Sequence, residues 1–288
     1  MTTRLLNSAE PADSGRINRM IEAVGKAQPA YAPYLTLFGK LLQRVDEAFV
    51  SHSTADIVVK ERSDSFFDYG DPLVTSEDVA ARAAVFVPRV LPALLEACAE
   101  SGEASAFTFL SRIKKGEITE ETLRTLLIDE AVEALSITNE EKTLLLYLIP
   151  LILRPYYQRM AEPFQEQIID REVEGSRCPV CGTKPAISIL MGENERRRLF
   201  CDQCRTEWFY PRLGCVHCGM SDPEMLGVMQ VPGEEHCRLD VCSNCRGYIK
   251  SILVEKMQRP VYLPLESAAT LHLDFIADRE GYSPGLQC

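Results

Sequence analysis

The chain has 288 residues, of which 46% are hydrophobic, and a formal net charge of -11 at pH 7. This size and composition allow a substantial core, so a disordered chain is excluded and two or three folded units are expected. Residues 172–250 contain 10 Lys or Arg and 11 Asp or Glu, against 31 and 42 in the whole chain. Neither the acidic whole nor this near-neutral segment has the basic footprint that nucleic-acid binding requires.

The N-terminal segment, MTTRLLNSAE, lacks the apolar stretch of a secretory signal. The longest apolar run, residues 144–153, is too short to span a bilayer and contains Pro150. We therefore expect a cytoplasmic protein without membrane insertion, in which thiols stay reduced and available to metal.

The first 170 residues are expected to be helical, because apolar positions recur every three or four residues between polar breaks. The expected helices are 15–25, 34–50, 76–99, 104–114, 119–136 and 139–168. Pro88 and Pro92 should kink or divide the third of them, and Pro150 and Pro155 should interrupt the last.

Short strand-like segments follow a change of composition at residues 172–177, and we expect them to form the hairpins of small ribbons. They are 186–190, 198–200 and 207–210, with a closing strand at 247–254 and a helix at 267–279 before a loose tail.

Eight of the 11 cysteines form four Cys-x-x-Cys pairs within 68 residues. Two residues between a pair let both thiolates face one ion, and two pairs complete a four-coordinate shell. We therefore predict two metal sites paired in chain order, with an interleaved pairing as the alternative. The predicted ligands are Cys178, Cys181, Cys201 and Cys204 in the first site, and Cys215, Cys218, Cys242 and Cys245 in the second.

Glycine follows the second cysteine of two pairs, at Gly182 and Gly219, and it tolerates the positive φ of a metal-binding knuckle. The other two pairs are less regular, with Arg205 and Arg246 at this position. A disulfide framework is the less favoured alternative without an export signal. Thiolate-only shells suit zinc and a mononuclear iron centre of rubredoxin type equally, so two metal ions per chain, iron or zinc, are expected.

These patterns predict a multidomain α+β protein, with an all-helical N-terminal domain followed by two small rubredoxin-like or zinc-ribbon modules. Metal should stabilise modules that are too small to fold by their own core. The expected boundaries are 1–170 for the helical domain, 171–212 and 213–262 for the first and second four-cysteine modules, and 263–288 for a C-terminal helix and tail.

Five further residues need an interpretation. Cys237 is expected to be an ordinary hairpin residue, with a spare ligand or a redox thiol as alternatives. His217 is expected to be an exposed turn residue. Cys98 and Trp208 are expected in the core, with a partner-facing surface as the alternative for Trp208, and Cys288 should be free in the tail.

No catalytic constellation is visible, since the sequence has no phosphate-binding glycine loop, nucleophile elbow or His-Glu-x-x-His helix. We therefore expect a protein that is not an enzyme, and a redox enzyme using one Cys-x-x-Cys dithiol is a weaker alternative. The run Arg196–Arg198 is the one candidate basic patch, and a solvated hairpin is favoured over a phosphate contact there.

The order and flanks of the cysteine pairs resemble the formate dehydrogenase accessory protein family, FdhE, over nearly the whole chain. The segments that carry the resemblance are Cys-Pro-Val-Cys-Gly at 178–182, Thr-Glu-Trp at 206–208, Gly-Tyr-Ile-Lys at 247–250 and the Pro-Tyr-Leu that ends residues 29–35. Cys237 and Cys288 are additions to the pattern, and the Cys201 knuckle lacks its glycine.

The resemblance implies a non-enzymatic, cytoplasmic assembly factor that binds the catalytic subunit of a molybdenum- or tungsten-containing formate dehydrogenase. It also implies rubredoxin-like, iron-binding cysteine motifs with a redox role during maturation, and assigns metal to the eight paired cysteines alone. A homodimer is compatible with these expectations. The alternative is a zinc-ribbon nucleic-acid-binding adaptor, against which the charge argues.

Overall fold

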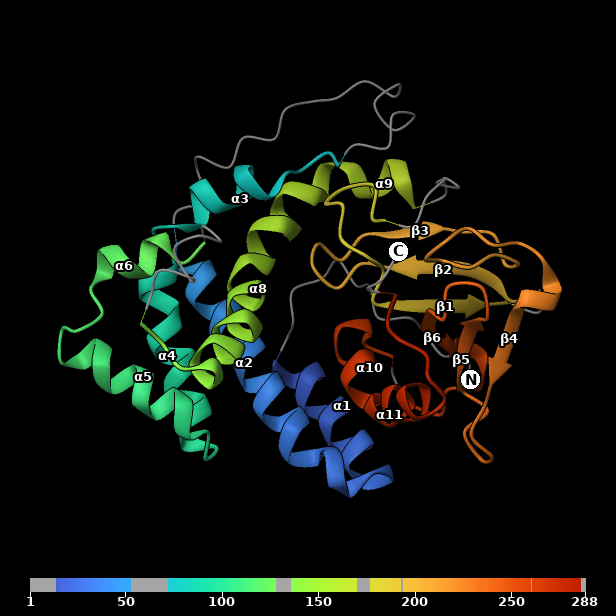
Figure 1. Ribbon diagram of the computed structural model, residues 1–288, viewed down its shortest axis with the longest axis horizontal. Helices are drawn as coiled ribbons and strands as arrows, with labels where there is room; N and C mark the ends of the chain where they lie inside the picture. Colours follow the sequence, from blue (N-terminus) through green and yellow to red (C-terminus); the bar gives the residue numbers. More distant parts are fainter. Residues whose placement is uncertain are drawn as a thin grey trace.

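The computed structural model of the chain describes residues 14–52, 72–127, 136–169, 177–192, 194–259 and 261–285. Helices fill one side of the molecule and a β-sheet the other (Figure 1). The predicted class is confirmed: a multidomain α+β fold, in which a helical N-terminal region precedes a β region with the two cysteine groups.

The helical region follows the apolar periodicity of the sequence. Its elements are α1 (Ser14–Ala27), η1 (Pro29–Tyr31), α2 (Ala32–Val50), α3 (Ser76–Ala83), α4 (Val87–Glu100), α5 (Ala104–Lys114), α6 (Glu120–Thr125), α8 (Asn139–Ala161), η3 (Glu162–Phe164) and α9 (Gln165–Ile168). Residues 128–135 of the predicted helix 119–136 lie outside the described part of the chain.

Prolines have different effects in two helices. The third predicted helix is divided, because α4 starts anew with Pro88 in its first turn, where a missing N–H costs no helical hydrogen bond. The prediction that Pro150 and Pro155 interrupt the last helix is wrong, since α8 continues through both. Side chains buried along α8 offset the lost hydrogen bonds, because tertiary packing supplies most of a helix's stability.

Six strands form one sheet in the order β3-β2-β1-β6-β5-β4. They are β1 (Ile187–Met191), β2 (Arg196–Phe200), β3 (Glu207–Phe209), β4 (Leu226–Met229), β5 (Cys237–Cys242) and β6 (Tyr248–Leu253). Each cysteine module contributes three antiparallel strands, and the two halves join where β1 runs parallel to β6, with Ser188 opposite Ser251. The two modules therefore share one hydrogen-bonded sheet.

The C-terminal region returns to the helical side. The predicted helix 267–279 is two helices, α10 (Leu263–Ala269) and α11 (Leu271–Arg279). Two short 3₁₀ helices complete the β region: η4 (Pro223–Met225) lies before β4, and η5 (Val254–Lys256) lies between β6 and α10. α10 contacts both α2 and β1, and so lies between the helices and the sheet (Figure 1). Among the described residues, no helix has both the length and the apolar character needed to cross a membrane.

Two hydrophobic clusters divide the core unequally. The larger one joins the helical region to the first cysteine module and includes Phe86, Tyr156 and Trp208. The smaller one lies between the sheet and α11 and includes Ile189 and Leu239. The first cysteine module is therefore packed into the helical core, whereas most of the second is not.

Candidate metal centres

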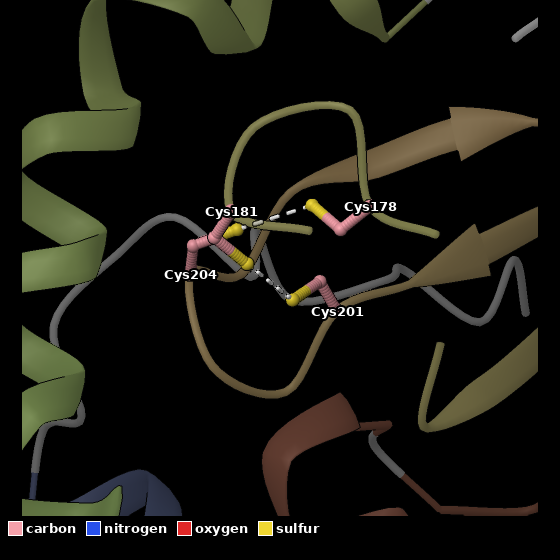
Figure 2. A group of neighbouring side chains, drawn as sticks. All are labelled: Cys178, Cys181, Cys201 and Cys204. Carbon is pink, nitrogen blue, oxygen red and sulfur yellow. Dashed lines mark hydrogen bonds between the residues drawn. The ribbon is translucent and has the colours of Figure 1, made fainter. Parts of the chain in front are cut away.

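Four thiols meet at the first predicted site. Cys178 and Cys181 come from the loop before β1, and Cys201 and Cys204 from the turn between β2 and β3. Figure 2 shows their Sγ atoms converging: 3.5 Å separate Cys178 from Cys204, and 3.4 Å separate Cys181 from Cys201. Cys181 is half-buried and the other three are buried.

The two loops of this site have the same backbone form. After the second cysteine of each loop the chain enters the left-handed region, with φ of 71° at Gly182 and 62° at Arg205. Thr183 and Thr206 then place their hydroxyls 2.7 and 3.1 Å from the sulfur of the second cysteine of their own loop. A hydroxyl that donates to a ligating sulfur orients it and helps to hold its charge.

These threonines were missed in the sequence, although a signal was present. Both stand two residues after the second cysteine, in Cys-Gly-Thr183 and Cys-Arg-Thr206. The repeat of a hydroxyl at the same place in two knuckles of one site would have indicated a contact with sulfur.

The thiols of the first site control one another's ionisation. Burial raises the pKa of Cys178 and Cys204 well above the usual value of a thiol. Burial also opposes ionisation of Cys201, but hydrogen bonds from Cys178 and Cys181 outweigh it and hold the Cys201 pKa well below that value. Burial thus opposes the ionisation of these thiols, and four clustered thiolates need a cation to balance their charge.

The second site has the same chain-order pairing. Cys215 and Cys218 precede β4, Cys242 ends β5, and Cys245 lies in the turn to β6. The Sγ atoms of Cys215 and Cys245 are 3.6 Å apart, and those of Cys218 and Cys242 are 3.8 Å apart. The interleaved pairing is not the one that the structure shows.

This second site is more open than the first. Cys218 is exposed, and the Asn244 amide lies 3.6 Å from its sulfur. The small burial of Cys218 raises its pKa, but hydrogen bonds from the Met220 N–H and the Asn244 amide outweigh that effect and lower the pKa to about 7. Solvent can therefore reach a sulfur that ionises near neutral pH.

His217 is not the exposed turn residue that the sequence predicted. Its ring is half-buried, and Nε2 lies 2.8 Å from the carbonyl oxygen of Tyr248. Burial lowers the pKa of His217, which favours the neutral ring. The knuckle folds back onto β6, a contact between distant segments that the local sequence does not reveal.

Both groups have the dimensions of a tetrahedral thiolate site. Two sulfur–sulfur distances in each group run from 3.4 to 3.8 Å, and all four sulfurs of a group lie within 4.8 Å of one another. Metal–sulfur bonds of about 2.3 Å give a tetrahedron edge of about 3.8 Å. The ten cysteines within the described ranges are all free thiols, so the disulfide alternative is wrong for them. Each group could hold one metal ion, and four thiolates accept zinc and iron alike.

The remaining candidates fall in three places. Cys98 and Trp208 are buried in the larger cluster, as predicted. Cys288 lies outside the described residues. Cys237 begins β5 and is buried, with its sulfur close to Glu234 and His272.

The run Arg196–Arg198 begins β2, the second strand of the β1–β2 hairpin, and Arg196 is exposed there as predicted, whereas Arg197 is buried. Arg197 is buried and pairs with Asp240 at 2.6 Å, because the alternation of a strand turns it into the sheet face. Arg196 and Arg198 stack on the Phe209 ring, with the guanidinium carbons 4.2 and 4.5 Å from its centre. All three guanidinium groups of the candidate basic patch therefore contact other side chains of the sheet.

A groove of about 310 Å³ lies between the helical region and the first cysteine site. Its walls are formed by α2, α8, α10 and the turn that carries Asp202 and Gln203. Arg154 is buried in this wall and pairs with Asp202, and Gln203 donates to the Pro150 carbonyl at 3.1 Å. Leu146, 59% exposed, forms part of the apolar lining.

Known proteins similar to this chain agree with the predicted resemblance. A family model described as FdhE, central domain, matches residues 177–212, which contain the first site. The Protein FdhE homolog of Aquifex aeolicus is 34% identical over 108 residues, which are 36% of this chain and 38% of the relative. That of Shewanella baltica (strain OS223) is 32% identical over 130 residues, 44% and 42% of the two chains.

The matching segment thus spans about two fifths of the length of these curated relatives. The crystal structure of the FdhE protein from Pseudomonas aeruginosa is similar over 96% of this chain and 97% of its own, with a TM-score of 0.64 and 20% sequence identity. At this identity the likeness shows a shared fold.

Proposed function

Because the resemblance to the FdhE family is confirmed, we propose that this chain is an accessory protein for the maturation or activation of formate dehydrogenase. It binds the catalytic subunit of a molybdenum- or tungsten-containing formate dehydrogenase in the cytoplasm and has no catalytic activity of its own. This role accounts for a chain that combines two metal-site geometries with an open groove lined by apolar and polar side chains.

We assign one metal ion, iron or zinc, to each thiol group. The ligands are Cys178, Cys181, Cys201 and Cys204 for the first ion, and Cys215, Cys218, Cys242 and Cys245 for the second. Either metal fixes the knuckles, and iron would also provide a change of oxidation state with the same four thiolates.

The groove beside the first site is the observation that carries the binding proposal. Leu146 and Tyr147 on α8 and Tyr34 on α2 leave apolar surface open to solvent at its rim. Exposed apolar side chains rimmed by polar ones mark protein-binding sites, and Asp202 and Gln203 line the same groove. A segment of the catalytic subunit would place apolar side chains here, against a wall that the first metal site holds in position.

The binding proposal is tested with the full chain and the purified catalytic subunit of a formate dehydrogenase from the same organism. Leu146→Glu should weaken the complex at least about tenfold, because it puts a charge into the apolar contact. Phe107→Glu is the matched control, since Phe107 is 70% exposed on α5, away from the groove, and should bind as the wild type does. Equal binding by both variants would exclude the groove, and no complex with the wild type would refute the function itself.

The metal assignment is tested by anaerobic purification from the native organism, with metal content and bound proteins measured in one sample. Two iron atoms per chain together with the catalytic subunit support a redox-capable maturation factor. Two zinc atoms with nucleic acid and without the subunit would contradict the proposed function in favour of the adaptor.

A further inference from the structure

A third group of metal-binding side chains lies outside both four-cysteine sites. Glu234, Cys237 and His272 bring a carboxylate oxygen, a sulfur and a ring nitrogen within 4.8 Å of one another. His272 Nε2 lies 2.6 Å from Glu234 Oε2, and the Cys237 sulfur lies 3.6 Å from the same oxygen. We propose that these three residues bind one divalent zinc-type ion, a third metal site of this chain.

The loop that carries two of the ligands is built like a knuckle. Two residues separate Glu234 from Cys237, the interval found in each Cys-x-x-Cys pair. The Cys237 N–H donates to the Glu234 carbonyl at 3.2 Å, which closes the turn and leaves both side chains on one side. The third ligand, His272, comes from the first turn of α11.

Groups from the helical region hold this site from the opposite side. Gln28, which follows α1, donates through Nε2 to the second carboxylate oxygen of Glu234 at 3.2 Å. The Tyr31 ring stacks on His272, with the ring centres 6.1 Å apart and the planes 18° apart. A neighbour that fixes the orientation of a ligand is typical of protein metal sites.

A second observation, a buried oxygen unpartnered among the described residues, points to a ligand at this place. Gln28 Oε1 is buried and has no hydrogen-bond partner in the part of the chain that the structure describes. One explanation of a buried carbonyl oxygen without a donor is a water or ion beside it. A His–Glu pair alone would not explain this oxygen, and the Cys237 thiol, which donates to the same carboxylate, adds a sulfur ligand beside it.

The donor set selects the class of ion. One thiolate, one imidazole and one carboxylate are ligands of zinc, and three protein ligands leave a fourth coordination position for water or for an added group. The thiolate and carboxylate carry two negative charges, which a divalent ion neutralises in this partly buried place. The bound ion would tie the β4–β5 turn to α11 beside the helical region, independently of client binding.

The test uses the full chain with both tetrathiolate sites filled with zinc, under reducing and oxygen-free conditions. Added Co²⁺ should bind as one further equivalent, with tetrahedral d–d bands and a sulfur-to-cobalt charge-transfer band of one thiolate. Total zinc after dialysis should be three per chain. Saturation at two zinc ions with no cobalt–sulfur band, or a third ion bound without that band, would overturn the proposal.

Variants locate the ion. Cys237→Ser should remove the charge-transfer band and one equivalent of metal, and Gln28→Ala should weaken binding about tenfold or more, because Gln28 only positions a ligand. Cys98→Ser, at a buried cysteine on α4, is the matched control and should still bind three. The cobalt spectrum of the wild-type chain decides whether the site exists. The proposal can therefore be refuted even if one of the variants fails to fold.

Discussion

Arg246 has two opposing effects on stability. It follows the second cysteine of its pair with φ of 56°, in the region where Gly219 has φ of 71°. A side chain in this region costs about 1 kcal/mol. Its guanidinium group, however, donates to the carbonyls of Glu280 and Gly281 at 2.6 and 3.1 Å and stacks on Tyr282. Arg246 thus takes an unfavourable backbone conformation in the knuckle, and its side chain connects that knuckle to the end of α11.

Replacement of this arginine shows which effect is larger. Arg246→Gly relieves the backbone but loses two hydrogen bonds of about 1 kcal/mol each and a cation–π contact of about 0.5 kcal/mol. We expect the free energy of unfolding, measured by urea denaturation of the metal-loaded chain, to fall by about 1.5 kcal/mol. Arg246→Lys serves as the control that keeps the charge without the planar fork. A glycine variant more stable than the wild type would mean that backbone strain dominates.

Among the elements, the four knuckles were predictable because their chemistry is local. The interval between cysteines and the glycines at 182 and 219 indicate two groups of four thiols, and the structure shows the chain-order grouping rather than the interleaved alternative. The backbone shows that Arg205 and Arg246 take the glycine conformation, so the two irregular knuckles are regular in form. What failed were features set by distant contacts, such as the passage of α8 through its prolines.

The two sites should differ in how fast they lose metal. Cys218 exposes one edge of the second site, whereas three of the four cysteines of the first are buried in the larger core. A coloured chelator added to the zinc-loaded chain should therefore release the zinc of the two tetrathiolate sites in two steps of equal amplitude. The fast step should disappear in Cys242→Ser and remain in Cys201→Ser. Loss of the slow step in Cys242→Ser would contradict the expected order.

At the scale of the whole molecule, the two modules share one sheet, while the first also shares its core with the helices. The sequence could not show the parallel pairing of β1 with β6, because alternation within a strand does not identify its neighbour. The boundaries at residues 170, 212 and 262 stay a prediction. Contacts that cross the first boundary include Val74 N–H to the Val180 carbonyl at 2.8 Å.

Because the first module shares its core with the helices and most of the second does not, loss of a ligand from the first site should affect other parts of the chain than loss of a ligand from the second. Cys201 and Cys242 are both buried, so Cys201→Ser and Cys242→Ser are a matched pair. A structural zinc site contributes about 10 kcal/mol or more, comparable with the stability of a whole domain. Amide hydrogen exchange should rise in α2, α4 and α8 as well as in β1–β3 for Cys201→Ser, since Trp208 and Tyr156 lie in one cluster. For Cys242→Ser the increase should be confined to β4–β6 and α11. Identical exchange maps for the two variants would mean that the helices fold independently of the first site.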